Sequence, residues 1–365
     1  MGKRPVSLDN ATILVTGSAG FIGASLCVRL LESTENSRIV GLDNLSAYYS
    51  PALKRARLDW VEAAAESSSS TWEFVEGSIA DARTVGNLFS AVRPSVVVNL
   101  AAQAGVRYSI DHPDEYIETN IVGFYNILEA CRRNPVEHLV YASSSSVYGG
   151  NKKVPFSTDD KTDCPVSLYA ATKKSDELLA HAYSSLYGIP ATGLRFFTVY
   201  GPYGRPDMFV YSAAEKICSG ETIQLFGEGL CKRDFTYIDD IVEGVVRVMR
   251  GAPLGGEGPS AAPHAVYNIG GGHPEMVIDM VGILQEELVR AGALSTSYDA
   301  GAHRQLVGMQ PGDVPLTFAD TKALERDYGF IPQVSLREGI RRFVEWYVTY
   351  HVREQCGDCD LSGEG

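Results

Sequence analysis

The sequence predicts an α/β protein, with a doubly wound parallel β-sheet followed by a smaller C-terminal α/β lobe. Short apolar stretches rich in β-branched residues alternate with helical patterns up to about residue 197. This alternation is typical of a parallel sheet whose strands are joined by right-handed crossovers. Beyond residue 197 the order becomes irregular, and glycine and proline are frequent. The change indicates a second lobe with a different architecture.

The periodicity of apolar residues predicts the individual elements. The expected strands are 12–16, 38–42, 72–75, 95–100, 138–143 and 192–197. The expected helices are 24–31, 80–92, 117–133 and 169–187, with another that starts at residue 59 and ends in a serine run at 67–70. We expect that run to be a flexible surface loop. A Gly/Pro/Ala-rich loop at 251–263 precedes a late strand at 266–269.

These elements suggest two units and a tail. Residues 1–197, with about 236–272 crossing back, are expected to form the sheet domain. Residues of about 198–235 and 273–350 are expected to form the smaller lobe. Residues 351–365 are expected to be a flexible tail, because Cys356 and Cys359 lie in a Gly/Asp-rich stretch without two further ligands at zinc-site spacing.

Composition and charge narrow the class of protein. The chain has 365 residues, is 45% hydrophobic and carries a net charge of −13. This charge disfavours a nucleic-acid or anionic-membrane partner, although a local pocket can still be basic. No apolar run approaches the ~20 residues of a membrane span, and 1–10 lack a signal-peptide pattern, so we expect a cytoplasmic protein. The seven cysteines are scattered and odd in number, so we expect neither a disulfide framework nor a metal site.

A glycine-rich turn follows the first expected strand. Gly17, Gly20 and Gly23 stand three residues apart between that strand and a helix. The first glycine permits the tight turn, the second lets the backbone approach a pyrophosphate, and the third permits close helix–strand packing. The helix N-terminus then offers partial positive charge to the phosphates. The motif therefore predicts a Rossmann-type dinucleotide site.

The end of the second expected strand indicates which dinucleotide is bound. Asp43 stands there, 20 residues after Gly23. A carboxylate at this position accepts hydrogen bonds from the adenosine ribose and repels a 2′-phosphate, which favours NAD over NADP. Arg55 and Arg57 lie nearby in sequence and keep NADP open as an alternative.

A tyrosine and a lysine four residues apart form a candidate acid/base pair. On a helix, this spacing places Tyr169 and Lys173 on one face, where the ammonium favours the phenolate. Such pairs also occur on solvated helix faces. The serine run 143–146 ends an expected strand, and the carboxyl ends of parallel strands line the ligand crevice. A hydroxyl there could bond a substrate oxygen while Tyr169 accepts its proton.

Together these motifs resemble the extended short-chain dehydrogenase/reductase family. The resemblance narrows to UDP-glucuronate 4-epimerases through further stretches and covers residues of about 11–350. They include GLDNLSAYYSPALKRARL, NLAAQAGVRYSIDHPDEYIETNIVGFYNILEACR, YASSSSVYG, TGLRFFTVYGPYGRPDM, KRDFTYIDDIVEG and GMQPGDVPLTFAD. Two departures concern cofactor contacts: Asn99 stands where a His is more usual, and Ser78 where an Asp often contacts adenine.

The resemblance implies roles for individual residues. Tyr169 would be the catalytic base, Lys173 its ribose-holding partner, and Ser144 the hydroxyl that bonds the sugar 4-oxygen. Arg233 would hold the UDP diphosphate, which suits a planar, always-charged fork. We expect Ser145, Ser146, Thr198 and Arg205 to hold a sugar carboxylate, with Arg107 as a weaker candidate. The implied NAD contacts are Gly17, Gly20, Phe21, Ile22, Gly23, Asp43, Asn44, Ile79, Ala101, Gln103, Asn120, Tyr169 and Lys173.

The resemblance also implies a reaction: inversion of C4 in a UDP-sugar acid, UDP-glucuronate to UDP-galacturonate, through a 4-keto sugar. The sheet domain would bind NAD and the smaller lobe the UDP-sugar. UDP-glucose 4-epimerase and UDP-glucuronate decarboxylase remain alternatives from the same family, and a non-catalytic NAD-sensing protein is an alternative from another class. A homodimer is expected, paired through the helices Ile117 to Arg133 and Tyr169 to Tyr187.

Overall fold

A seven-stranded parallel sheet forms the centre of the molecule. The computed structural model describes residues 2–256, 261–299, 301–309 and 314–357. The strand order is β12-β7-β6-β5-β2-β3-β4. From β2 the chain adds β3 and β4 on one side, and from β5 it adds β6, β7 and β12 on the other, which is the doubly wound arrangement. The strands are β2 (Thr12–Thr16), β3 (Arg38–Asp43), β4 (Thr71–Glu76), β5 (Val96–Asn99), β6 (His138–Ser144), β7 (Ala191–Phe196) and β12 (His264–Ile269).

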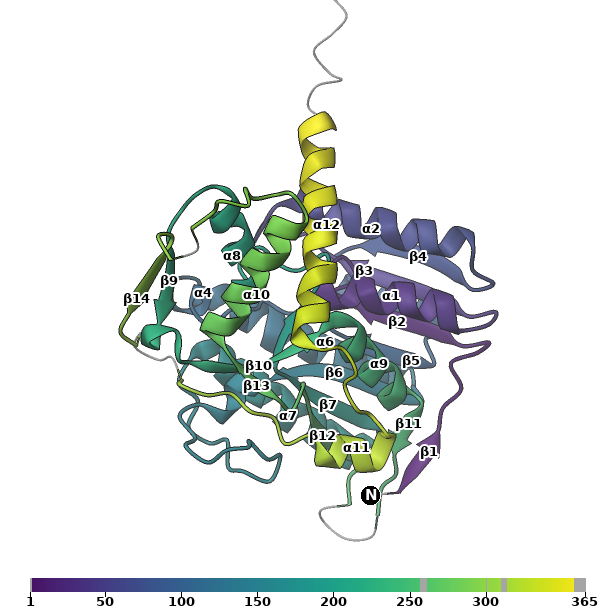
Figure 1. Ribbon diagram of the computed structural model, residues 1–365. Helices are drawn as coiled ribbons and strands as arrows, with labels where there is room; N and C mark the ends of the chain where they lie inside the picture. Colours follow the sequence, from purple (N-terminus) through teal and green to yellow (C-terminus); the bar gives the residue numbers. More distant parts are fainter. Residues whose placement is uncertain (1, 257–260, 300, 310–313, 358–365) are drawn as a thin grey trace, which may run out of the picture.

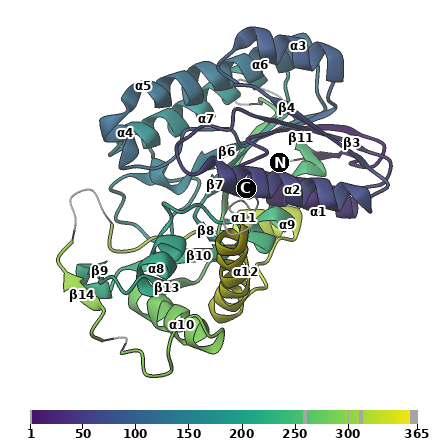
Figure 2. The ribbon, with the colours of Figure 1, turned by 90° about the horizontal axis from the view of Figure 1, so that it is seen from above.

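Helices cover both faces of this sheet, as Figure 2 shows. Because both faces are buried, the central strands are apolar without alternation, and the side chains of Val96 to Val98 are fully buried. One face carries α1 (Phe21–Ser33), α2 (Pro51–Glu66) and α9 (Ile238–Met249). The other carries α3 (Ala82–Val92), α6 (Phe124–Arg133) and α7 (Leu168–Tyr187), with the short α4 (Tyr108–Asp111) and α5 (Pro113–Tyr116) nearby.

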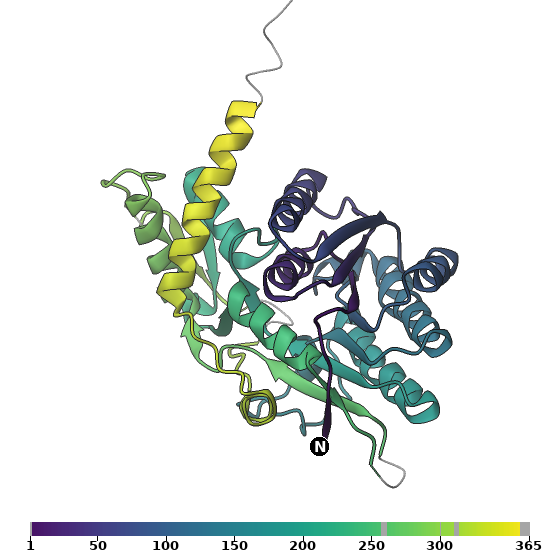
Figure 3. The same ribbon diagram turned by 90° about the vertical axis from the view of Figure 1, so that its right-hand side faces the viewer.

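A smaller assembly lies beside the carboxyl-terminal half of the sheet (Figure 3). Its three-stranded sheet has the order β13-β10-β8, and β14 pairs with β9 in parallel. The strands are β8 (Thr198–Tyr200), β9 (Ile223–Phe226), β10 (Lys232–Tyr237), β13 (Pro274–Met276) and β14 (Arg304–Val307). The helices are α8 (Phe209–Cys218), α10 (Val277–Arg290), α11 (Lys322–Tyr328) and α12 (Leu336–Gly357), with a 3₁₀ turn at Gly227–Gly229.

The chain returns from this region to the large sheet. β12 pairs with β7 in parallel along its whole length. Near the N-terminus, β1 (Lys3–Pro5) pairs with β11 (Gly251–Pro253) in an antiparallel ribbon. Asp234 on β10 is fully buried and accepts hydrogen bonds from the backbone N–H groups of Gly271, Gly272 and Ala319. These bonds tie the small sheet to the loop that follows β12 and to the segment that precedes α11.

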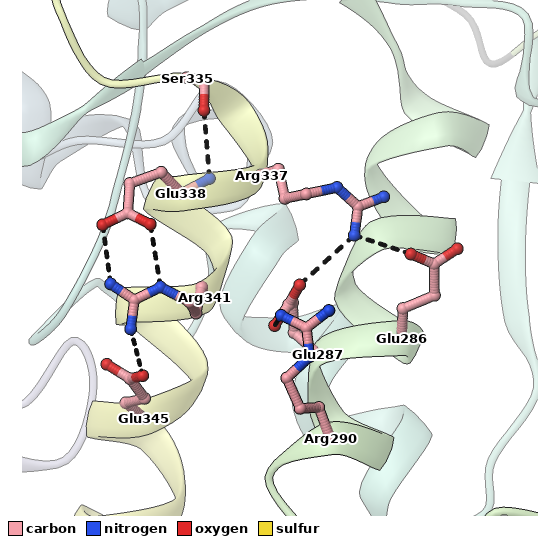
Figure 4. Close-up of polar contacts among 8 residues, drawn as sticks. All are labelled: Glu286, Glu287, Arg290, Ser335, Arg337, Glu338, Arg341 and Glu345. Carbon is pink, nitrogen blue, oxygen red and sulfur yellow. Dashed lines mark hydrogen bonds and ion pairs between the residues drawn. The ribbon is translucent and has the colours of Figure 1, made fainter.

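The long helix α12 packs along α10 and extends past the body of the molecule (Figure 1). Arg337 donates to Glu286 on α10 at 2.8 Å and also pairs with the buried Glu287 at 3.4 Å (Figure 4). Glu338 and Arg341 form a bidentate pair one turn further on. Arg337 and Glu286 are both about half exposed, so we assign this pair little stability and treat the Arg337 contacts as orienting α12 against α10. The Glu338–Arg341 pair lies within α12.

The parallel sheet predicted from the sequence is confirmed, and three expectations about elements are corrected. The second helix starts at Pro51 rather than at residue 59, because proline is well suited to a first helical turn. The serine run after it is tied down: Ser68 donates to Leu31 O, and the buried Ser70 donates to Thr34 O. The expected tail at 351–365 is helical up to Gly357, and 358–365 lie outside the described residues.

Candidate active site

The glycine-rich turn joins β2 to α1 with little space around it. Gly17 has φ +73°, and a Cβ there would lie 2.7 Å from Ala101 N. A Cβ on Gly23 would lie 2.0 Å from Gly17 O, so only glycine permits this close packing. Gly20 precedes α1, whose first turn carries no acidic residue, and Phe21 is buried while Ile22 is partly exposed. The cradle and the unneutralised helix N-terminus fit a dinucleotide pyrophosphate.

Asp43 ends β3 beside this turn. Its Oδ2 accepts a hydrogen bond from Ala19 N at 3.1 Å, and its Oδ1 accepts one from Leu45 N at 2.9 Å. Lys54 Nζ lies 3.8 Å from Oδ1. The next residue, Asn44, is exposed and accepts from Ser46 N. The carboxylate is therefore fixed at the strand end, where a ribose would be bound.

Asn120 links the loop after β5 to α7. The expected helix at 117–133 begins with a π-helical segment, Ile117–Gly123, before continuing as α6. The buried Asn120 in this segment accepts from Gln103 N, donates to Gln103 O and donates to Thr172 Oγ1. π-Helical turns often mark functional sites. Ile79, after β4, is buried, and Ala101, after β5, is partly buried.

The pair Tyr169 and Lys173 lies on α7, which Ser167 caps by accepting from Ala170 N. Tyr169 is partly exposed and Lys173 is buried. Lys173 Nζ donates to Asp176 Oδ2 at 2.8 Å, with both side chains 2% exposed. Burial raises the pKa of Asp176 to about 6, although the Lys173 ammonium opposes the shift. Asp176 was missed in the sequence, although its spacing from Lys173 on a helix was visible.

The serine run lies where the end of β6 meets a 3₁₀ turn, Ser145–Tyr148. Ser144 is buried, pairs with Phe196 in register and accepts from Ser146 N at 3.1 Å. Ser143 points instead to Glu177 on α7, donating at 2.7 Å. Ser145 and Ser146 are partly exposed. The end of β6 therefore presents three consecutive hydroxyls, 144–146, at the carboxyl edge of the sheet.

Arg205 and Asp207 form a second charged pair at this edge. Arg205 donates to Asp207 through Nε at 2.9 Å and through Nη2 at 2.5 Å. Tyr48, in the loop after β3, donates to Asp207 Oδ2 at 3.1 Å. Burial and the nearby Asp207 charge raise the pKa of Tyr48 to about 12, so its hydroxyl keeps the proton that it donates. Arg205 also interacts electrostatically with Tyr169.

A small cavity brings three of the predicted residues together: Phe21 from the turn, Thr198 from β8 and Arg205 all line it. Arg107 and Arg233 are not among the described residues that line it. Arg107 is exposed and lies over the Phe226 ring, with 5.8 Å from Cζ to the ring centroid. Arg233 lies on β10 opposite Glu275 of β13 and donates to Lys232 O.

Two features are absent from the described residues. In the part of the chain that the structure describes, no three His, Cys, Asp or Glu side chains gather as a candidate metal site. No described helix is both long and apolar enough to cross a bilayer.

The parallel sheet, the glycine cradle and the Tyr169/Lys173 helix define an α/β enzyme that uses a dinucleotide. Residues 13–270 match the NAD dependent epimerase/dehydratase family, and the chain belongs to this family. The buried Arg57, described below, donates all its N–H groups within the protein, which removes it as a partner for a 2′-phosphate.

Similar proteins give finer comparisons. UDP-glucuronate 4-epimerase 4 of Arabidopsis thaliana is 44% identical over 357 residues, covering 95% of this chain and 78% of the relative. The crystal structure of UDP-glucuronic acid 4-epimerase from Bacillus cereus with UDP-glucuronic acid and NAD superposes with a TM-score of 0.80. It is 30% identical and covers 93% of this chain and 99% of that one. UDP-glucose 4-epimerase of Thermotoga maritima, solved with UDP-glucose, gives 0.77, also at 30% identity and over the same shares of the two chains.

Proposed function

We propose that this protein is an NAD-dependent UDP-glucuronate 4-epimerase. The observation that carries the proposal is the cavity that Thr198 and Arg205 line together, just after the strand whose end, Phe196, pairs in register with Ser144. The Tyr169 phenol can accept a proton, and the Arg205 guanidinium can bind a carboxylate. Together they suit a sugar acid that reacts at C4 while its C6 carboxylate is held. The relatives of this family that act on UDP-glucuronate support the same substrate class.

In the proposed reaction, Tyr169 accepts the proton of the sugar 4-hydroxyl and returns it after the sugar has turned over. When bound, NAD supplies a reversible acceptor for the C4 hydride, so no net redox change results. Lys173 provides the positive charge that favours the phenolate, and Ser144 bonds the 4-oxygen. The turn at Gly17–Gly23 and Asp43 hold the dinucleotide, with Phe21, Ile22, Asn44, Ile79, Ala101, Gln103 and Asn120 as the remaining assigned contacts.

The carboxylate needs its own set of partners, because the 4-keto form of a glucuronate is a β-keto acid that readily loses CO₂. Fixed hydrogen bonds keep the bond to the carboxylate carbon out of alignment with the ketone. We assign this task to Ser145, Ser146, Thr198 and Arg205. Asp207 accepts from Nε and Nη2 of Arg205. The Nη1 side of the guanidinium can therefore donate to a second carboxylate.

The nucleotide half of the substrate would lie over the smaller lobe. Arg233 on β10 is assigned to the UDP diphosphate. Arg107, which lies over the Phe226 ring at the end of β9, stays the weaker candidate for the sugar carboxylate. In this division, residues 1–197 and about 236–272 bind NAD, whereas about 198–235 and 273–350 bind the UDP-sugar.

The experiment that tests the proposal compares kcat/KM for UDP-glucuronate and UDP-glucose. We expect UDP-galacturonate as the product and a clear preference for the acidic substrate. A preference for UDP-glucose would assign the enzyme to the alternative epimerase. Formation of UDP-xylose or a UDP-4-keto-pentose would make it a decarboxylase and contradict the roles given to Ser145 and Ser146.

We also propose a homodimer paired through residues 117–133, which form the π-helical segment and α6, and through α7. These helices lie side by side on one outer face of the molecule (Figure 2). Large apolar side chains are exposed there, which a monomer would have no reason to keep. They are Val122 (42%), Tyr125 (46%), Leu178 (60%), Leu186 (72%) and Tyr187 (50%).

A further inference from the structure

Arg57 on α2 is fully buried, although its side chain carries a permanent charge. None of its hydrogen-bond partners in the described chain is a carboxylate: they are three backbone carbonyls and one phenol. It donates to Ala19 O, Tyr203 O, Gly204 O and Tyr49 Oη. Tyr203 O accepts twice, from Nε at 3.0 Å and from Nη2 at 2.7 Å. The hydrogen bonds therefore match the donors of a guanidinium one for one.

These bonds join segments that are far apart in the sequence. Ala19 lies inside the glycine-rich turn, between Gly17 and Gly20. Tyr203 and Gly204 immediately precede Arg205. The Nη1 bond to Ala19 O is 3.0 Å long and the Nη2 bond to Gly204 O is 3.2 Å long. One planar group thus contacts the backbone of the dinucleotide turn and the backbone of the Arg205 loop, which we define as residues 201–208.

Hydrogen bonds fix the glycine-rich turn at Ala19 from two sides. Ala19 donates its N–H to Asp43 Oδ2, while its carbonyl accepts from Arg57. Asp43 is the carboxylate assigned to the NAD ribose. A continuous series of hydrogen bonds therefore runs from that carboxylate through Ala19 to the Arg205 loop.

The Arg205 loop needs such support because its backbone is strained. Tyr203 has φ +58°, in the left-handed region that residues other than glycine rarely adopt. Its ring stacks on Trp60, also on α2, with centroids 4.7 Å apart and planes 8° apart. It also packs against Trp346 of α12 at 5.1 Å. Helix α2 therefore contacts both the backbone of Tyr203, through Arg57, and the Tyr203 ring, through Trp60.

We propose that Arg57 is a positioning residue that couples the dinucleotide turn to the Arg205 loop, so that NAD and the sugar acid stabilise each other's binding. The proposal rests on the proposed function, because it assigns the turn to NAD and Arg205 to the substrate. Coupling of two sites is reciprocal: if the sugar nucleotide tightens NAD, it must slow the release of NAD or speed its capture. Because all its N–H groups bond within the protein, we assign Arg57 no direct contact with either ligand.

The test measures NAD release from the NAD-loaded enzyme, alone and with a saturating, equilibrated mixture of UDP-glucuronate and UDP-galacturonate. We expect the sugar nucleotides to slow release by about fivefold or more in the unmodified enzyme. In Arg57→Met the ratio of the two release rates should fall to about one. Arg57→Lys keeps the charge but not the fork, so its ratio should fall as well. Arg55→Met, an exposed arginine on the same helix, is the matched control and should keep the unmodified ratio.

A merely structural role for Arg57 would raise both release rates by the same factor and leave their ratio unchanged. That result, or a ratio of one in the unmodified enzyme, would overturn the proposal. Should Arg57→Met fail to fold, Arg57→Lys decides. Should the enzyme not turn over UDP-glucuronate, the proposed function fails separately, and the same assay with the UDP-sugar that it does turn over still tests the coupling.

Discussion

The charge of Lys173 is balanced within the helix that carries it. Burying an ammonium alone would cost several kcal/mol, and Asp176, one turn along α7, offsets this at 2.8 Å. The Tyr169/Lys173 spacing was readable from the sequence because both residues lie on one helix. The same holds for Asp176, but a helix sequence contains many such spacings. Only the burial of α7 against β6 distinguishes this pair from a solvated one.

Tyr169→Phe should abolish turnover while leaving NAD binding intact, because it removes the proton acceptor and little else. The measurement is the initial rate of UDP-galacturonate formation together with the NAD content of the purified protein. Unchanged turnover would rule out Tyr169 as the base. Turnover and NAD content lost together would point to a structural role for the phenol.

Arg205→Lys should weaken the binding of UDP-glucuronate but not that of UDP-glucose. Lysine preserves the charge beside Asp207 but cannot offer two parallel donors to a second carboxylate. We expect KM for UDP-glucuronate to rise by about tenfold or more, the equivalent of losing a charge-assisted hydrogen bond. KM for UDP-glucose is the internal control and should change by less than about twofold. Equal rises for both substrates would remove Arg205 from carboxylate recognition.

At the level of elements, the strands of the large sheet were predictable, whereas the strands of the smaller lobe and the irregular helix were not. The interiors of β2, β5 and β6 are apolar without alternation because helices cover both faces of the sheet, so these strands can be recognised in the sequence. The π segment at Ile117–Gly123 leaves none. Its inner face is fixed by Asn120, which bonds partners at Gln103 and Thr172. Such a turn is decided by tertiary contacts, which local periodicity does not contain.

His138, the first residue of β6, should make stability depend on pH. It is buried between Thr192 Oγ1 and Met249 O, and burial lowers its pKa to about 4 from an ordinary 6.5. Between these two values the unfolded chain binds the extra proton and the folded protein does not. The free energy of unfolding should therefore fall as the pH drops from 6.5 to 4, and this site contributes about 2 kcal/mol of that loss by pH 5.

The measurement is urea unfolding at pH 7.5 and pH 5.0 for the unmodified protein and for His138→Gln. Glutamine retains hydrogen-bonding groups but does not titrate, so the variant should lose about 2 kcal/mol less between the two conditions. His264 has a pKa lowered to about 4 by burial as well, so some pH dependence should remain. Equal losses in the two proteins would contradict the assignment to His138.

At the scale of the whole molecule, the sequence predicted which residue types would meet but not every partner. Tyr48 and Asp207 are 159 positions apart, and Arg57 and Tyr203 are 146 apart. Contacts of this kind arise only when the tertiary fold brings distant segments together, and nothing in the sequence near either residue indicates the other. Sequence patterns could assign Gly17, Asp43, Ser144 and Tyr169 to a site, because each stands at a strand end or on a regular helix.

The proposed dimer can be tested with one surface charge. Leu186→Asp introduces a carboxylate into the apolar face of α7, where the side chain is 72% exposed. We expect the molar mass by light scattering to fall from that of a dimer to that of a monomer. Ile331→Asp is the control, since Ile331 is also exposed, at 54%, but lies away from α6 and α7. A monomeric unmodified protein would contradict the proposal.

The position of β12 has a consequence for synthesis on the ribosome. β7 ends at Phe196 and its outer neighbour begins only at His264, so about 70 residues separate them. At ~5–20 residues per second, the outer edge of β7 waits roughly 3 to 14 s for its partner. All six residues of β7 are buried in the finished protein, and such an edge readily pairs with another chain. Slow translation between residues 197 and 263 should therefore lower the yield of native enzyme without altering any molecule that completes its sheet.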